Sequence, residues 1–429
     1  MIDIRLVRTD FDSVLSALRR RGVDPGEVRR LAALDAAASD LVRRRDEARA
    51  AVKALSREVA AAQRSGEGEL SEQLRVQSRE KGVEAGLLEK EAEAAAEARR
   101  EALLRLPNLP SSEAPDGAGP DDNPVVRTWR PENCSYAPWQ RVPHWDVGRD
   151  LGILDLESGA KLSGSMFPLY RGAGARLLRA LTNFALDDHL RGGFEEIRPP
   201  TMVKTATMVS TGHLPKFSEE AYHVERDDLW AIPTAEVPLT SLGREEVLDE
   251  GQLPMRLTAA TSCFRREAGA AGRDTRGLLR VHEFDKVEVL AYATPSQAGD
   301  VHAELLARAE GLLAALGLEY RVVDLCTGDL GSSSARTFDL EAYAPGTDRW
   351  LEVSSVSWFS DYQARRANIR YRPSRGGPPA FVHTLNGSAL AWPRIWAALV
   401  EVNRNADGSV KVPDCLRGYM GGQEAIPAP

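Results

Sequence analysis

The feature that most constrains the fold is a heptad pattern near the start of the chain. Between residues 31 and 62, mostly apolar side chains recur at alternating steps of three and four residues, the spacing of a coiled-coil seam. These positions are Leu31, Leu34, Ala38, Leu41, Arg45, Ala48, Val52, Leu55, Val59 and Ala62. A break at SGEGE (65–69) separates them from a weaker seam through Leu70, Leu74, Leu88, Ala92, Ala95 and Leu106. We therefore predict an antiparallel helical hairpin over about residues 31–106, roughly 50 Å long at 1.5 Å per residue.

A segment rich in proline and glycine follows the predicted hairpin. Residues 107–124 read PNLPSSEAPDGAGPDDNP, which cannot hold a helix, whereas residues 1–106 contain one proline, Pro25. We predict an N-terminal domain over residues 1–106, a linker over 107–124 and a second domain over 125–429.

The second domain mixes strand-like and helical segments, which predicts an α+β fold. The strand-like runs are LTAATSCF (257–264), FDKVEVLAY (284–292), YRVVDL (320–325) and WLEVSSVSWF (350–359). The helical segments are residues 173–189, 294–316 and 390–403. We expect a mainly antiparallel sheet flanked by helices.

Charge is distributed unevenly over the predicted hairpin. The net charge of -8 gives no overall attraction for nucleic acid, so such binding requires a local basic face. Residues 31–65 carry seven basic and five acidic residues, and residues 66–106 carry seven basic and ten acidic residues. The basic residues of the first helix are Arg43, Arg44, Arg45, Arg49, Lys53, Arg57 and Arg64. They form either a surface for a phosphate backbone or a solvated coiled-coil face, and spacing alone does not decide between them.

Cysteine usage and hydropathy indicate the compartment. Cys134, Cys263, Cys326 and Cys415 form no CxxC pair, which argues against a thiolate zinc site and against a secreted disulfide framework. No run of about 18 apolar residues occurs, and the first twenty residues carry charges every few positions. We therefore expect a protein of the reducing cytoplasm, with neither a signal peptide nor a membrane span.

The most informative stretch is CFRREAGAAGRDTRGLLRVHEFDKVEVL (263–290), which has two strand-like ends joined by a loop rich in glycine and arginine. The guanidinium groups of Arg265, Arg273, Arg276 and Arg280 suit phosphate or carboxylate oxygens. Strand alternation places Arg265 and Glu267 on one face, and Arg280, His282, Phe284, Lys286 and Glu288 on one face of the partner strand. A face of this composition is either a ligand site or the solvent-exposed side of an edge hairpin.

This hairpin resembles motif 2 of the class II aminoacyl-tRNA synthetases, and the whole chain resembles the bacterial seryl-tRNA synthetases. GFEEIRPP (193–200) is similar to motif 1, and TLNGSALAWPRIWAALVEVN (384–403) is similar to motif 3. Stretches similar to those of the serine enzymes are TGHLPKF (211–217), PTAEVPLT (233–240), CTGDLG (326–331), QARRANIRYR (363–372), FVHTLNGS (381–388) and CLRGYMGG (415–422). The resemblance implies a long antiparallel coiled-coil arm that binds tRNA, followed by a class II catalytic domain.

The resemblance also implies a two-step reaction. The serine carboxylate attacks the α-phosphate of ATP, and the seryl group then passes to tRNA(Ser). Because the nucleophile is already an anion, the first step requires charge neutralisation and in-line positioning and no general base. The implied partners also include Mg²⁺, a second copy of the chain in a homodimer and, as a further acceptor left open, the selenocysteine tRNA.

Each implied role falls on residues present in this sequence. Arg265 and Arg394 are the implied catalytic residues. The implied ATP-binding residues are Arg265, Arg266, Glu267, Arg280, Val281, Phe284, Glu352, Val353, Ser354, Ser355 and Arg394. The implied serine-binding residues are Thr234, Ala235, Glu236, Arg265, Glu288, Asn386 and Ser388. Glu352 and Ser355 are the implied ligands of Mg²⁺, and the seven basic residues of the first helix are the implied tRNA-binding set.

Four residues depart from the family pattern and keep alternatives open. Val356, Trp358, Met166 and Trp392 stand where other residues are expected, and they could reshape the pocket wall. They leave room for a specialised paralogue of a biosynthetic or antibiotic-resistance pathway. Two further alternatives are a catalytically inactive paralogue that binds tRNA and a ligase that loads a carrier protein, although relatives of the second kind lack the arm.

Overall fold

The computed structural model describes residues 1–132, 134–269 and 274–429. Arg273, one of the predicted loop cations, therefore lies outside the described residues. The chain divides into two compact units, Ile2–Leu106 and Pro107–Pro429, and Met1 belongs to the second. No helix within the described residues is long and apolar enough to cross a membrane.

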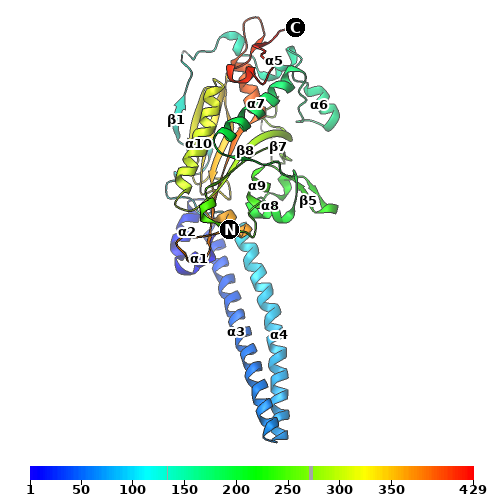
Figure 1. Cartoon of the computed structure of the whole chain (residues 1–429), viewed down its shortest axis with the longest axis vertical. Coiled ribbons are helices and arrows are strands. Elements are labelled where there is room, and N and C mark those ends of the chain that lie inside the picture. The colour runs from blue at the N-terminus through cyan, green and yellow to red at the C-terminus, as the bar shows by residue number, and fades with distance from the viewer. Residues whose placement is uncertain (133, 270–273) are drawn as a thin grey trace. The chain divides into compact units, whose positions relative to one another are not determined.

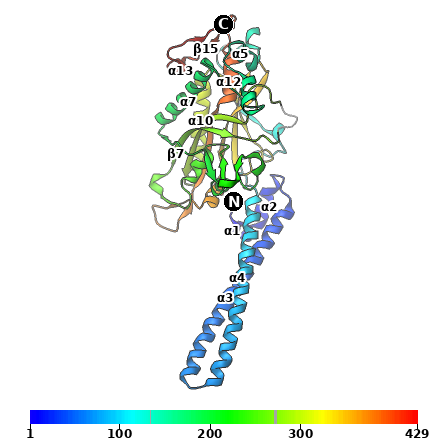
Figure 2. The same ribbon diagram turned by 90° about the vertical axis from the view of Figure 1, so that its right-hand side faces the viewer.

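The N-terminal unit consists of four helices, α1 (Ile4–Thr9), α2 (Phe11–Arg19), α3 (Pro25–Arg64) and α4 (Gly68–Arg105). Helices α3 and α4 lie side by side as a long antiparallel pair (Figures 1 and 2), which confirms the predicted hairpin. Helix α3 starts six residues before the predicted boundary because Pro25 suits the first helical turn and the Asp24 carboxylate accepts a hydrogen bond from Gly26 N at 3.0 Å. Helices α1 and α2 were not predicted.

The seam between the two long helices follows the heptad pattern on α3 more closely than on α4. All ten predicted positions of α3 are buried or half-buried. On α4, Leu88, Ala92 and Ala95 are buried or half-buried as predicted. The prediction for Leu70 is wrong, because this residue is 43% exposed. The helix phase instead turns Ser71 inward, where it is buried. Much of the seam is alanine, so the two helices bury little apolar surface for their length.

One buried charge anchors the base of the hairpin. Asp35 on α3 is almost fully buried and accepts hydrogen bonds from Arg8 at 2.5 and 2.7 Å and from Arg99 at 3.1 Å. The hydrogen bonds from Arg8 hold the pKa of the Asp35 carboxyl below its ordinary value, and those from Arg99 add to the effect. Asp35 therefore ties α1, α3 and α4 together at one point.

The second unit is built on an eight-stranded sheet, which confirms the predicted α+β class. The strand order is β1-β9-β10-β11-β14-β8-β7-β2, and every described pairing in it is antiparallel except that of β2 with β7. The strands are β1 (Val125–Trp129), β2 (Glu195–Glu196), β7 (Met255–Phe264), β8 (Glu283–Ala293), β9 (Tyr320–Asp324), β10 (Arg336–Ala344), β11 (Arg349–Trp358) and β14 (His383–Ala391). The predicted strands correspond to β7, β8, β9 and β11, whereas β10 and β14 were not predicted as strands.

Three helices cover one face of this sheet. Helices α7 (Ala173–Arg191), α10 (Ala298–Ala315) and α12 (Trp392–Val402) form the main hydrophobic core with it, and Figure 2 shows α7, α10 and α12 beside the strands. Along β8, Val287, Val289 and Ala291 point into this core. Because side chains alternate along a strand, Phe284, Lys286 and Glu288 point to the other face. The opposite face of the sheet is therefore the one available for a ligand.

Smaller elements complete the second unit. A second core cluster packs α9 (Glu236–Ser241) and α11 (Tyr362–Ala367) against Leu257, Leu290 and Tyr292 on the face opposite the main core. The remaining helices are α5 (His144–Asp150), α6 (Leu156–Ser163), α8 (Thr205–Thr211), α9 (Glu236–Ser241), α11 (Tyr362–Ala367) and α13 (Asp414–Arg417). The remaining strands are β3 (Met202–Lys204), β4 (His223–Val224), β5 (Leu229–Ala231), β6 (Val247–Asp249), β12 (Arg370–Arg372), β13 (Ala380–Phe381), β15 (Val410–Lys411) and β16 (Ala425–Ile426).

The proline-rich segment 107–124 packs on the second unit. Its described regular structure is one short 3-10 turn, Pro120–Asp122. The Asn108 side-chain amide donates hydrogen bonds to the carbonyl oxygens of Ser333 at 2.9 Å and Phe359 at 2.8 Å. Gly117 approaches Cys326 so closely that a Cβ at Gly117 would lie 2.7 Å from the cysteine Sγ. These contacts hold the segment in place without helix or strand.

Candidate active site

A pocket opens on the face of the sheet that the three core helices leave uncovered. It lies where the β7–β8 hairpin, β11, β14 and the start of α12 converge. The lining residues are Arg265, Glu267, Leu278, Leu279, Arg280, Val281, Phe284, Lys286, Glu352, Val353, Ser354, Ser355, Ser388, Ala391, Pro393 and Arg394. Segments far apart in the sequence therefore supply one concave and mainly polar surface.

The upper wall of the pocket is the β7–β8 hairpin. The Arg265 guanidinium carbon lies 5.1 Å from the centroid of the Phe284 ring, and Glu267 pairs with Arg280 at 2.5 Å. Arg265 and Glu267 lie beyond the end of β7 at Phe264, so their predicted common strand face does not exist, and Glu267 has a φ of +49°. Both side chains nevertheless reach the pocket.

His282 holds the base of this hairpin and does not line the pocket. Its ring Nδ1 lies 3.0 Å from Arg265 O, and its carbonyl oxygen accepts a hydrogen bond from Arg265 N at 2.9 Å. His282 N also donates to Met166 O at 3.0 Å. These contacts agree with a structural function for this histidine.

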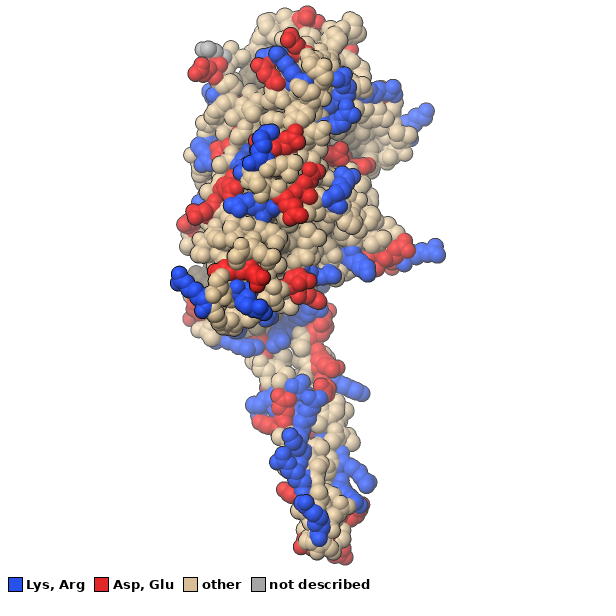
Figure 3. Space-filling model, in the orientation of Figure 1, with Lys and Arg blue, Asp and Glu red and all other residues tan. Residues whose placement is uncertain are grey.

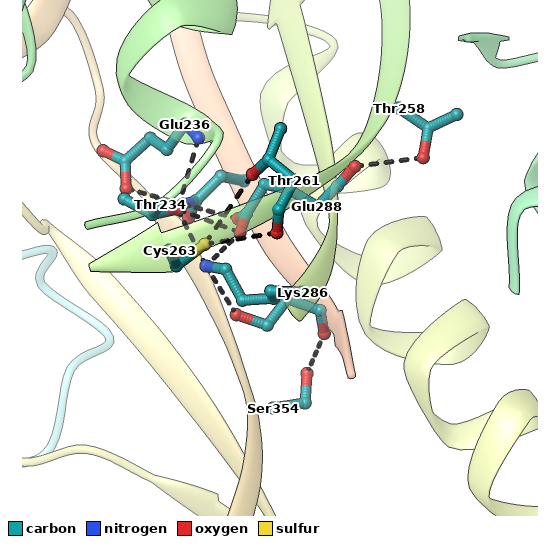
Figure 4. Close-up of polar contacts among 10 residues, drawn as sticks. Thr234, Glu236, Thr258, Thr261, Cys263, Lys286, Glu288 and Ser354 are labelled. Carbon is teal, nitrogen blue, oxygen red and sulfur yellow. Dashed lines mark hydrogen bonds and ion pairs between the residues drawn. The ribbon is translucent and has the colours of Figure 1, made fainter. Parts of the chain in front are cut away.

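The floor of the pocket is centred on Lys286, which was not among the predicted site residues. The residue is 4% exposed, and Nζ donates to Thr234 Oγ1 at 2.7 Å and to Ser388 Oγ at 3.2 Å. Lys286 also forms an ion pair with Glu288. Figure 4 shows Thr234, Lys286 and Glu288 converging at this point. The signal was present in the sequence, because Lys286 shares a strand face with Phe284 and Glu288.

Two buried carboxylates lie beneath the floor. The Asn386 side-chain amide donates to Glu236 at 2.8 Å and to Glu288 at 3.1 Å, so it bridges them. Glu288 also accepts from Thr234 Oγ1 at 3.0 Å. The Gln363 amide donates to the other oxygen of Glu236 at 2.6 Å, and Thr384 Oγ1 donates to Gln363 at 2.7 Å. Every carboxylate oxygen of this pair therefore has a donor.

The electrostatics of this pair favour a bound cation. Burial, together with the charge of Glu288, raises the pKa of Glu236 to about 7. Burial also raises the pKa of Glu288, against the opposing effect of the Lys286 ammonium. Two carboxylates share one buried ammonium here, so a ligand that brings a second ammonium group would balance the charge.

The two implied ligands of Mg²⁺ have the position and the chemistry that this ion requires. Glu352 and Ser355 both line the pocket, and hard oxygen ligands suit this ion. Behind them, Asp339 has a buried Oδ1 without a hydrogen-bond partner, and burial together with the charge of Glu352 raises its pKa well above the ordinary value. A cation held at Glu352 would relieve this repulsion. Among the described residues, no group of three or more His, Cys, Asp or Glu side chains is arranged to hold a metal ion, so substrate phosphates would have to complete the coordination.

The structure brings nearly all predicted site residues together, in two layers. Ten of the eleven predicted ATP-binding residues line the pocket, and the exception is Arg266, whose backbone N donates to Glu220 O at 2.9 Å. Arg265 and Ser388 from the predicted serine set also line it. The other members of that set, Thr234, Ala235, Glu236, Glu288 and Asn386, are buried at or beneath the floor. Gln363 was not predicted, because nothing in the sequence links it to Glu236, 127 residues away.

None of the four departures from the family pattern lines the pocket. Val356 is part of the main core on the helix-covered face, and Trp358 packs against that core and donates from Nε1 to His383 Nδ1 at 3.2 Å. Trp392 is fully buried in the same core. Met166 has a φ of +66° and accepts the hydrogen bond from His282 N described above. These four residues therefore contribute no side chain to the lining of this pocket.

On the helical hairpin, the predicted tRNA-binding residues differ in how they are paired. Arg43, Arg44, Arg45 and Arg49 form ion pairs with acidic residues of the hairpin. Lys53, Arg57 and Arg64, nearer the turn, are exposed, and no ion pair is found for them within the described part of the chain. Figure 3 shows Lys and Arg side chains gathered on the visible face of the hairpin. The turn half of α3 therefore carries the cations available to a phosphate backbone.

Comparisons with known proteins agree with this architecture. The family model described as "tRNA synthetase class II core domain (G, H, P, S and T)" matches residues 220–403, which include every lining residue of the pocket named above. The sheet and its pocket therefore define the catalytic core of a class II aminoacyl-tRNA synthetase. The model described as "Seryl-tRNA synthetase N-terminal domain" matches residues 1–110.

Full-length relatives identify the subgroup. The chain is 49% identical to a serine–tRNA ligase of Gemmatimonas aurantiaca over 98% of this chain and 99% of the relative, and 43% identical to one of Prosthecochloris aestuarii over 98% of each. A crystal structure of seryl-tRNA synthetase from Pyrococcus horikoshii complexed with ATP has a TM-score of 0.93 and 34% identity, covering 100% of both chains. The chain belongs to the seryl-tRNA synthetase family.

Proposed function

We propose that this enzyme activates L-serine with ATP to form seryl-adenylate and then transfers the seryl group to tRNA(Ser). The observation that carries the proposal is the position of the buried Thr234–Lys286–Glu288 cluster directly beneath a pocket that holds Arg265. One layer supplies groups for a phosphate, and the layer below supplies groups for a small polar amino acid. The family relationship supports the same assignment.

Adenylate formation requires two anions to meet. Arg265 stands above the floor, where the serine carboxylate and the ATP α-phosphate would both reach it, and its guanidinium can donate to the two groups at once. Phe284 and Arg394 offer the two faces of an adenine site, with Glu267 for the adenine amino group and the Val281 backbone beside it. Arg280 would hold the γ-phosphate. Because Arg280 now pairs with Glu267, ATP has to replace this ion pair.

Serine selection follows from the polar floor. Glu236 and Glu288 would hold the substrate ammonium group together with Thr234 and the adjacent Ala235, and Asn386 and Ser388 would meet the hydroxyl. Alanine would leave these buried groups without a partner, which is a strong basis for rejection. Threonine adds one methyl group, so its rejection depends on the space beside Ser388.

Glu352 and Ser355, with the backbone of Val353 and Ser354 between them, would hold Mg²⁺ against the triphosphate. When bound, the ion neutralises phosphate charge and helps to orient the leaving pyrophosphate. Two arginines act independently of the ion: Arg265 bridges the reacting groups, and Arg394 positions the nucleotide.

We assign the binding site for tRNA to the helical hairpin. Lys53, Arg57 and Arg64 offer exposed charges for a phosphate backbone, and Arg43, Arg44, Arg45 and Arg49 would join them after exchanging their present acidic partners. The selenocysteine tRNA is a second acceptor to be tested in the same assay. We propose a cytoplasmic location for the enzyme, in agreement with its predicted reducing compartment.

We also propose a two-fold homodimer. The motif 1 segment contains β2, a two-residue strand at the edge of the sheet with exposed Glu195 and Glu196. A sheet edge of this kind is suited to cover by a second copy of the chain. Sedimentation at micromolar concentration checks this, since a monomer would contradict it.

Serine-dependent exchange of pyrophosphate into ATP tests the first step. The proposed function predicts exchange with serine and at most weak exchange with alanine, threonine or cysteine. An inactive paralogue would show no exchange, and a specialised paralogue would exchange another amino acid better. A ligase for a carrier protein would form the adenylate and leave tRNA uncharged.

A further inference from the structure

We propose that a buried pair, His144 and Glu401, positions the backbone of residues 278 and 279 in the wall of the ATP pocket, and that His144 is therefore a positioning residue for ATP binding. The inference rests on the proposed function, and it assigns a task to two groups that the reaction itself does not use. Both side chains are completely buried.

His144 begins α5 and makes three hydrogen bonds. Leu278 N donates to its Nε2 at 2.9 Å, so this nitrogen carries the lone pair and the ring proton lies on Nδ1. Nδ1 donates to Glu401 Oε1 at 2.9 Å, and His144 N donates to the same oxygen at 2.9 Å. The carboxylate thus fixes the tautomer in which Nε2 can accept from Leu278.

Glu401 lies on α12, seven residues after Arg394 and so on the same side of the helix. Two residues of this helix hold the 278–279 segment, one directly and one through His144. Arg394 Nε donates to Leu279 O at 3.3 Å, and Glu401 acts through His144 on Leu278 N. The second oxygen of Glu401 accepts from Gly346 N at 2.8 Å, so the same carboxylate also holds the turn before β11.

The fit around His144 leaves the loop little freedom. Gly277 has a φ of +59°, and a Cβ at this position would lie 2.3 Å from His144 Nε2 and 2.6 Å from Trp145. The Arg276 guanidinium carbon lies 5.1 Å from the centroid of the Trp145 ring, and Asp274 pairs with Arg349 at 2.9 Å. The return segment of the hairpin loop is thus seated on α5 and on the turn that Glu401 holds.

Loss of the hydrogen bond between Leu278 N and His144 would shift the backbone at the nucleotide end of the pocket. Leu278, Leu279, Arg280 and Val281 are consecutive and all line it, so a shift at Leu278 moves Arg280 and Val281 as well. The serine end is built on β8, β14 and α9, and within the described part of the chain His144 and Glu401 form no hydrogen bond to Thr234, Glu288 or Ser388. The structure therefore predicts an effect on the KM for ATP that the KM for serine does not share.

Two substitutions at position 144 separate the two ring nitrogens. His144→Asn places an amide near the Nδ1 position, which keeps the donor to Glu401 and removes the acceptor for Leu278 N. His144→Gln extends to the Nε2 position and restores an acceptor there. In serine-dependent pyrophosphate exchange with the full-length protein, His144→Asn should raise the KM for ATP by about tenfold or more, because a buried N–H is left unpaired. His144→Gln should recover most of this loss.

The matched control is His302→Gln. His302 is also buried, and it lies on α10 against the opposite face of the sheet, with Nε2 3.1 Å from Val356 O. This variant should lower the melting temperature and leave both KM values within about twofold of wild type. A wild-type protein without serine-dependent exchange would contradict the proposed function and not this inference.

The inference is overturned if His144→Asn folds and keeps the wild-type KM for ATP, or if the KM values for ATP and serine rise by the same factor. If His144→Asn does not fold, Glu401→Gln carries the test, because an amide cannot accept from all three N–H groups. A raised KM for ATP with an unchanged KM for serine in Glu401→Gln would support the inference, and an unchanged KM for ATP would overturn it.

Discussion

The helical hairpin and the catalytic sheet use charge in opposite ways. On the hairpin, most charged side chains other than Asp35 are exposed, and several pair with neighbours three or four residues away on the same helix, as Arg43 does with Asp40 and Glu47. In the pocket, Glu236, Lys286 and Glu288 are buried, and each is held by side chains from distant segments. Exposed helix pairs contribute a few tenths of a kcal/mol each, whereas an unpaired buried charge costs several kcal/mol.

This difference implies that substitutions in the hairpin and in the pocket have separate effects. The charges of the hairpin are available to a partner because losing their present contacts costs little. The charges of the pocket are fixed before a substrate arrives, which is what an electrostatic catalyst requires. The experiments below test this separation, beginning with the change expected to have the largest effect.

Shortening the hairpin should abolish tRNA charging and spare adenylate formation. Deleting residues 43–93 and joining 42 to 94 by a short glycine-containing turn keeps the Asp35–Arg99 contact at the base and removes all seven candidate cations. We expect serine-dependent pyrophosphate exchange to stay within about an order of magnitude of wild type, since the hairpin and the pocket belong to different compact units. Loss of both activities in a folded protein would show that the hairpin is part of the catalytic machinery.

A milder variant sharpens this test. Replacing Lys53, Arg57 and Arg64 together by glutamine should weaken charging and reduce its salt dependence, because up to three phosphate contacts are lost. An unchanged salt dependence would assign the tRNA contacts to other residues.

Arg265→Ala is the corresponding change in the pocket. The interaction of Arg265 with carboxylate and α-phosphate strengthens as the transition state forms, and such donors contribute roughly 3 kcal/mol. Serine-dependent exchange should therefore fall by at least about 100-fold. Arg265→Lys should rescue little, because an ammonium group cannot bridge both anions as a guanidinium does.

The control for Arg265 is Arg226→Ala, which removes an exposed arginine of the same unit outside the pocket. It should leave exchange unchanged. Near-normal exchange by a folded Arg265→Ala enzyme would mean that the β7–β8 hairpin does not carry the first step.

Ser388→Ala should have a smaller effect. It removes a neutral acceptor of Lys286 Nζ at the substrate end of the floor, while Thr234 and Glu288 still hold the lysine. We expect a loss of about 1–2 kcal/mol, seen mainly as a higher KM for serine in the exchange assay. A change in the KM for ATP alone would place Ser388 at the nucleotide end instead.

The pH dependence of serine use should report on Glu236. Its pKa is raised from 4.5 to about 7, so the carboxylate forms only as the pH passes 7, and only the carboxylate attracts the serine ammonium group. kcat/KM for serine should therefore fall by roughly tenfold between pH 8 and pH 6. The same shift means that ionising Glu236 costs folding stability as the pH rises from about 4.5 through 7. Glu236→Gln should flatten the profile of its residual activity, and a profile that keeps its break near 7 would assign the ionisation elsewhere.

The same contrast explains which features the sequence could predict. The hairpin follows from local periodicity, so α3 and most of the α4 seam were predicted, and Leu70 failed because the phase of α4 is set by its start at Gly68. On β8, alternation placed Phe284, Lys286 and Glu288 together because the strand is long and regular. Alternation failed for Arg265 and Glu267, which lie beyond the end of β7, and for Arg280 and His282, which precede β8.

Long-range partners explain the rest. Family resemblance brought together residues of the pocket, but no local pattern connects Gln363 to Glu236 or His144 to Leu278. Such pairs form only when strands and helices from separate parts of the chain converge. Strand β14 was missed because its pattern mixes polar site residues with apolar core residues, whereas β10 has a regular polar–apolar alternation that was overlooked.

Aminoacylation of bulk tRNA with labelled serine, alanine, threonine and cysteine in parallel tests the central claim most directly. The account predicts efficient charging with serine alone, with loss of that charging in both the shortened-hairpin enzyme and Arg265→Ala, and retained exchange only in the first. Charging with another amino acid in preference to serine, or serine-dependent exchange without any charging of tRNA by the intact enzyme, would contradict it.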